Sequence, residues 1–97
     1  MKAIALYARY GEKCKREHES FNEALSGLRW GNELGEMYPL GIICGDILYV
    51  DGGRWSIYSS KDKEENGIDI AKKFGIKFKK IKTVDMFCEP KSNSLDK

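Results

Sequence analysis

Histidine, proline and paired cysteines are scarce in this chain of 97 residues, which holds one histidine, two prolines and three cysteines. Cys14, Cys44 and Cys88 are odd in number and form no CxxC pair, which indicates reduced thiols in a cytoplasmic setting. Cys14 and His18 lie four residues apart, but a structural zinc normally takes four ligands. We therefore interpret this pair as part of a solvated loop and expect neither a metal nor a cofactor.

Long apolar runs and catalytic signatures are also missing. No segment is apolar over the length of a membrane span, and the start lacks the length and cleavage site of a secretory signal. P-loop, GxGxxG, HExxH and GxSxG patterns do not occur. With one histidine and no convergent set of reactive residue types, the sequence favours a protein that is not an enzyme. The net charge of +2 is too small to imply a nucleic-acid partner by itself.

The composition is that of a soluble globular protein, with 41% hydrophobic and 33% charged residues. A chain of this length holds one hydrophobic core. We expect a single domain over residues 1–88, followed by a flexible tail at residues 89–97 that contains Pro90.

Residues 41–58 form the most regular pattern in the chain. Three short apolar runs occupy residues 41–44, 47–50 and 55–58. Gly45-Asp46 separates the first two runs and suits a type II′ turn, and Asp51-Gly52-Gly53 suits a second hairpin turn because glycine tolerates positive φ. The pattern predicts a three-stranded antiparallel meander.

Alternation along the meander predicts two apolar faces. One face carries Ile43, Leu48, Val50, Trp55 and Ile57, and the other carries Ile42, Cys44, Ile47, Tyr49 and Tyr58. The second face is too apolar to lie against water, so it is either covered or a contact surface. A homodimer is one arrangement that would cover it.

The first half of the chain predicts a strand, a loop and a helix. Residues 3–10 are apolar on both faces, which is typical of a central strand. Residues 11–19 are polar and are interpreted as a loop. Ser20 and Glu23 fit a capping box, and a helical stripe follows before Gly31 ends the helix. The stripe consists of Phe21, Ala24, Leu25 and Leu28.

The last third of the sequence predicts a charged loop at residues 59–66. A short helix at residues 67–74 follows, capped by Asn66 and ended by Gly75. The last predicted strand covers residues 76–84 and has a bulge near Lys79-Lys80. The summed order is β-α-β-β-β-α-β. We therefore expect an α+β fold, with an antiparallel sheet and two short helices on one face, and a ferredoxin-like variant with an extra strand is one candidate.

Aromatic residues supply the first set of candidate binding residues. Trp30, Met37 and Tyr38 stand on a glycine-rich connector, where they either cap the core or form a patch for a partner. Tyr49 and Tyr58 either contact a partner or a base, or pack within the domain. The predicted partner-binding set is Trp30, Met37, Tyr38, Tyr49 and Tyr58.

Lysines supply the second set. Residues 72–82 hold six lysines and no acid. A compact patch of this kind would bind phosphate in a nucleic acid or a small signalling nucleotide, whereas lysines on an edge strand also protect it from pairing with other chains. The alternative ligand-binding set is Arg54, Lys77, Lys79, Lys80 and Lys82.

The run FNEALSGLRWGNELGEMYPLGII resembles a pattern in small accessory proteins of bacteriophages. There a Phe-x-x-Ala helix leads through Gly-Glu-Leu/Met-Tyr-Pro into an apolar strand. The matching positions are Phe21, Ala24, Gly35, Glu36, Met37, Tyr38, Pro39, Ile42 and Ile43. The resemblance covers residues 21–43. It implies a role in host takeover or anti-defence, by binding a host protein or by sequestering a nucleotide, in the cytoplasm of the bacterial host cell.

Overall fold

The computed structural model describes residues 2–53 and 58–86. Within these residues the chain forms five strands and two helices in the order β-β-α-β-β-α-β. The elements are β1 (Ala3–Arg9), β2 (Glu12–His18), α1 (Phe21–Glu33), β3 (Tyr38–Cys44), β4 (Ile47–Asp51), α2 (Ser60–Phe74) and β5 (Lys80–Val84). The predicted α+β class is confirmed.

The strands of the described residues form one mixed sheet in the order β2-β1-β3-β4-β5. Neighbouring strands are antiparallel except for β4 and β5, which are parallel and are connected through α2. The predicted meander would place residues 55–58 beside β4 as a third antiparallel strand. In the structure, β5 pairs with that edge of β4 along its whole length. Residues 54–57, including Arg54, lie outside the described residues.

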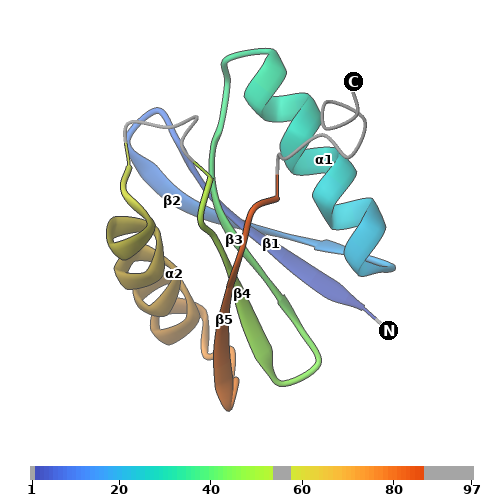
Figure 1. Ribbon diagram of the computed structural model, residues 1–97, viewed down its shortest axis with the longest axis vertical. Helices are drawn as coiled ribbons and strands as arrows, with labels where there is room; N and C mark the ends of the chain where they lie inside the picture. The colour runs from blue at the N-terminus through green and yellow to red at the C-terminus, as the bar shows by residue number, and fades with distance from the viewer. Residues whose placement is uncertain (1, 54–57, 87–97) are drawn as a thin grey trace, which may run out of the picture.

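The two helices cover opposite faces of the sheet (Figure 1). The prediction of both helices on one face is therefore wrong. On the α2 face, the buried core consists of Leu6, Leu40, Ile43, Leu48, Val50, Ile70 and Ala71. On the α1 face, it consists of Ala3, Ala5, Ala24, Leu28, Ile42 and Met86. Of the second apolar face predicted from the sequence, Ile42, Cys44 and Tyr49 pack beneath α1, whereas Tyr58 packs against the α2-face core.

Two hairpin turns set the register of the sheet. Gly45 has φ of 65° in the two-residue loop between β3 and β4, as a type II′ turn requires at its first central position. Tyr10 and Gly11, at φ of 51° and 81°, form the loop between β1 and β2, which is the backbone of a type I′ turn. The predicted β3–β4 hairpin is confirmed, whereas the predicted loop at residues 11–19 is wrong because most of it is β2.

Both helices begin at serine caps. Ser20 Oγ accepts a hydrogen bond from the Glu23 backbone N–H, as predicted, while the Glu23 carboxylate accepts from the Glu19 N–H. Ser59 and Asp62 form a full capping box at the start of α2. The second helix therefore begins seven residues earlier than the predicted start at residue 67, and Asn66 lies inside it.

The end of α2 agrees with the prediction, and the strand after it is shorter than predicted. Gly75 ends the helix in the left-handed conformation, with φ of 68°. The predicted strand at residues 76–84 is confirmed only over β5, which begins at Lys80. In the described part of the chain, neither helix has the length and apolar character needed to cross a membrane.

Candidate interaction surface and pocket

Helix α1 and its C-cap residue Leu34 carry large apolar side chains on the solvent side. Its buried residues are Ala24, Leu28 and Gly31, which face the sheet. Trp30 and Leu34 lie four positions apart and therefore share another side of the helix. Trp30 is 66% exposed and Leu34 54% exposed, values expected of polar residues rather than of a tryptophan and a leucine.

Two more exposed aromatic residues lie at the same end of the molecule. Tyr10 at the β1–β2 turn is 81% exposed, and Tyr38 at the start of β3 is 42% exposed. The pairing of Ala8 with Tyr38 and the contact between Arg9 and Glu36 at 3.6 Å place the turn beside the segment that follows α1. Figure 1 shows this turn and the last turn of α1 at the same end of the sheet. We call the exposed set Tyr10, Trp30, Leu34 and Tyr38 the apolar end.

The predicted partner-binding residues divide between this surface and the interior. Trp30 and Tyr38 belong to the apolar end. Tyr58 is half-buried against the α2-face core and stacks edge-to-face with Tyr38, with ring centroids 5.7 Å apart. Met37 is half-buried and occupies the space beside Gly31, which has no side chain. Tyr49 packs under α1 against Phe21, with ring centroids 5.0 Å apart.

The alternative ligand-binding lysines do not share one element. Lys77 and Lys79 precede β5, and Lys80 and Lys82 lie on it. In the described part of the chain β5 is an edge strand, so Lys80 and Lys82 stand where lysines commonly prevent pairing with another chain. Arg54, the fifth member of the set, lies outside the described residues.

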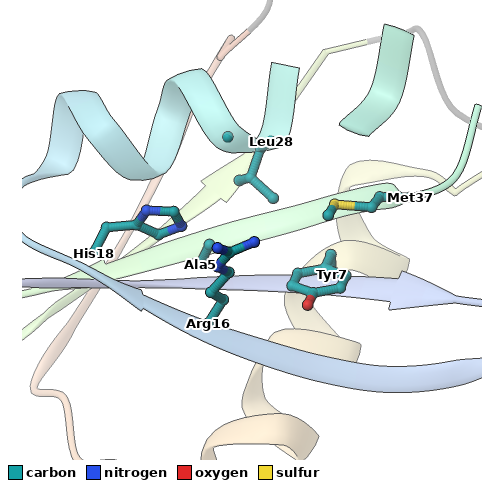
Figure 2. A pocket seen from close by; sticks show the side chains of 7 residues that line it. Ala5, Tyr7, Arg16, His18, Leu28 and Met37 are labelled. Atoms are coloured by element: carbon teal, nitrogen blue, oxygen red, sulfur yellow. The ribbon is translucent and has the colours of Figure 1, made fainter. Parts of the chain in front are cut away.

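Sequence patterns did not reveal a small pocket between α1 and the β2 edge of the sheet (Figure 2). We call it the α1–β2 pocket. It is lined by Ala5, Tyr7, Arg16, His18, Gly27, Leu28 and Met37. Ala5 and Arg16 are direct partners in the β1–β2 register, so their side chains point to the same face of the sheet, toward α1. A hairpin predicted from Tyr10-Gly11 would have placed them together.

Gly27 explains how the pocket forms. A methyl group at this position would lie 3.2 Å from His18 Cε1, so the missing side chain lets the imidazole pack against α1. The His18 side chain is 14% exposed, and its Nδ1 lies 3.6 Å from Glu23 Oε1. His18 is therefore held at one end of the pocket by α1 itself.

The structure does not support the Cys14 and His18 pair as a metal site. Both residues lie on β2, where four residues extend over about 13 Å. Cys14 Sγ instead contacts the Glu12 carbonyl oxygen at 3.7 Å. Among the residues that the structure describes, no group of three or more histidine, cysteine or acidic side chains could hold a metal ion.

Comparisons of the chain with protein-family models, curated proteins and solved structures return no match.

Proposed function

We propose that this chain is a non-enzymatic binding protein of the phage type, which acts in the bacterial cytoplasm by occupying a host protein or a component of a defence system. The observation that carries the proposal is the apolar end. Three aromatic residues and one leucine are exposed at one end of the sheet, Trp30 and Leu34 on the α1 side and Tyr38 beside Tyr58 on the α2 side. The bacterial and phage setting rests on the sequence resemblance at residues 21–43.

The composition of the apolar end supports a protein partner. Tryptophan and tyrosine are enriched at the energetic centres of protein interfaces, because they bury a large area at a small cost in side-chain entropy. Arg9 and Glu36 lie beside Tyr10 and Tyr38 and supply opposite charges at the rim. Exposed aromatic residues beside a pair of opposite charges are typical of a protein interface rather than of a phosphate site.

Affinity capture from a bacterial lysate tests the proposal. The bait is the full chain, compared with Trp30→Ala and Tyr38→Ala variants. Phe74→Ala is the matched control, because Phe74 is as exposed as Tyr38, at 42%, but lies at the end of α2. We expect one host protein to be retained by the wild type and by Phe74→Ala and lost from the other two variants.

Thermal unfolding of the same variants separates binding from folding. We expect Trp30→Ala to change the unfolding free energy by less than about 0.5 kcal/mol, because the side chain is mostly exposed. A partner retained equally by all four proteins would contradict the proposed surface. Unfolding of Trp30→Ala would show instead that the tryptophan belongs to the core.

A further inference from the structure

We infer that the α1–β2 pocket accepts the carboxylate of an aspartate or glutamate side chain of the protein that binds the apolar end. The inference rests on the proposed function, which it extends by naming the chemistry of the partner. It is carried by one unpaired guanidinium, by the size of the pocket and by the position of the pocket on α1.

Arg16 is an exposed residue at the edge of the pocket, and its guanidinium has no partner among the described residues. In the described part of the chain, Arg9 contacts Glu36, and Arg29 donates to the Met86 carbonyl oxygen at 2.9 and 3.1 Å. Arg16 makes neither a hydrogen bond nor an ion pair with any described residue. Figure 2 shows its guanidinium directed toward α1, between His18 and Tyr7. A guanidinium presents five N–H donors in a fork that matches a carboxylate.

The acid nearest to the pocket on α1 is already engaged. Glu23 accepts a hydrogen bond from the Glu19 N–H at 3.2 Å and faces His18 Nδ1. Across the strand pair, the partner of Arg16 is Ala5, which offers no acceptor in its side chain. The described residues therefore place no carboxylate against Arg16, and its guanidinium is free to receive one from a partner protein.

The dimensions of the pocket select a small group. The pocket has little more than the room that one water needs. One oxygen of a carboxylate fits such a space, whereas a nucleotide does not. Leu28, Met37 and Ala5 form apolar walls that suit the methylene groups behind the carboxylate.

The pocket lies on the same side of α1 as the exposed apolar pair. Gly27, Trp30 and Leu34 are separated by three and four residues, which places them along one side of the helix. A partner segment that covers Trp30 and Leu34 can therefore place an acidic side chain at Gly27, beside Arg16. The expected partner motif joins an aspartate or glutamate to neighbouring apolar residues.

Selection from a displayed library of random short peptides tests the inference with a defined probe. The wild type is compared with Arg16→Gln and with Lys15→Gln, which removes the same charge from the next residue of β2. Lys15 is a suitable control because its ammonium lies over the Phe74 ring, 5.3 Å from the centroid, on the α2 face. Trp30→Ala is selected in parallel to test the apolar end.

We expect the wild type and Lys15→Gln to enrich peptides that join an acidic residue to apolar residues. Arg16→Gln should enrich apolar peptides without the acidic position, and it should bind a wild-type peptide about tenfold more weakly, since a hydrogen bond to a charged group is lost. Wild-type peptides without an acidic position, or an acidic preference retained by Arg16→Gln, would overturn the inference and leave the proposed function standing. If the wild type enriches no apolar peptides, or Trp30→Ala selects the same ones, the proposed function fails and the inference fails with it.

Discussion

Lys63 Nζ donates a hydrogen bond to Asp51 Oδ2 at 2.8 Å, and the two side chains are 0% and 2% exposed. Lys63 also donates to the Gly53 carbonyl oxygen at 3.1 Å. Asp51 Oδ1 accepts from the N–H groups of Gly53 at 2.9 Å and Met86 at 3.3 Å. The pair therefore joins the end of β4, the second turn of α2 and the segment after β5.

Because both carboxylate oxygens and the ammonium have partners, we assign the pair a structural role in stabilising the fold. Asp51 is the last residue of β4, and Met86 follows the parallel strand β5. The parallel pairing of two strands separated by a whole helix is thus reinforced at its end by one buried ion pair. Removing one partner would leave the other charged in an apolar interior, which is costly.

We predict that Lys63→Met lowers the free energy of unfolding by about 3–5 kcal/mol, a large part of the stability of a domain of this size. The double variant Lys63→Met/Asp51→Asn should recover part of this loss, because an asparagine oxygen still accepts from Gly53 and Met86 while the buried charge is gone. Urea unfolding followed by circular dichroism measures both values.

Lys61→Met is the control for this variant. Lys61 lies in the first turn of α2 and is exposed, so its substitution should change the unfolding free energy by less than about 0.5 kcal/mol. Equal effects of the two substitutions would show that the buried ion pair contributes nothing specific.

Local signals explain which elements were predictable. The serine cap and apolar stripe of α1, the Gly45-Asp46 turn and the apolar strand β1 are each encoded by neighbouring residues. β2 was missed because five of the seven residues of EKCKREH are glutamate, lysine or arginine, so the segment lacks apolar alternation. These charges suit its position at the edge of the sheet, where Lys13 contacts Asp69 of α2 at 3.1 Å.

Long-range pairings could not be predicted from local patterns. The parallel alignment of Leu48 with Ile81, and the ion pair of Asp51 with Lys63, depend on where α2 returns the chain.

The residues of the candidate site also divide into those that local patterns predicted and those that depend on long-range packing. Trp30 and Tyr38 were identified from residue type, but the predicted connector was wrong at both positions, because Trp30 lies in α1 and Tyr38 begins β3. Arg16 was not identified, because its importance depends on α1 packing beside a strand that the sequence pattern concealed.

Gly67 offers a stabilising substitution. It is buried in the middle of α2, and a methyl group there would lie 3.6 Å from both Leu48 δ-carbons and 3.7 Å from Leu6 Cδ1, which is ordinary contact. Alanine is also the better helix former. We predict that Gly67→Ala raises the free energy of unfolding by about 0.5–1 kcal/mol, measured from the urea midpoint.

Gly11→Ala is the matched comparison. A methyl group at Gly11 would meet no other atom within 4 Å, but its φ of 81° is strained for any residue with a side chain. This variant should lose about 1 kcal/mol. A lower midpoint for Gly67→Ala than for the wild type would mean that the contacts at the sheet are tighter than these distances indicate.

Lys80 and Lys82 can be tested as protectors of an edge strand. Replacing both with threonine should raise the apparent mass in light scattering, because an uncharged edge strand can pair with a second chain. Lys72→Thr/Lys73→Thr removes equal charge from the last turn of α2 and should leave the mass unchanged. The alternative phosphate-binding function predicts another result. The β5 variant would then keep its mass and lose a salt-sensitive affinity for a single-stranded oligonucleotide.

Two of the five predicted partner-binding residues, Trp30 and Tyr49, should respond to substitution in opposite ways. Tyr49 packs against Phe21 beneath α1, and it borders the core formed by Leu28 and Ile42. Tyr49→Ala should therefore lower the free energy of unfolding by about 2–3 kcal/mol, below the full cost of removing a completely buried ring. Trp30→Ala should leave it nearly unchanged while abolishing partner capture. Because both substitutions remove a large aromatic side chain, this contrast assigns Tyr49 to the packing of α1 on the sheet and Trp30 to the interface. A Tyr49→Ala variant of wild-type stability that loses the partner would instead place Tyr49 in the binding surface.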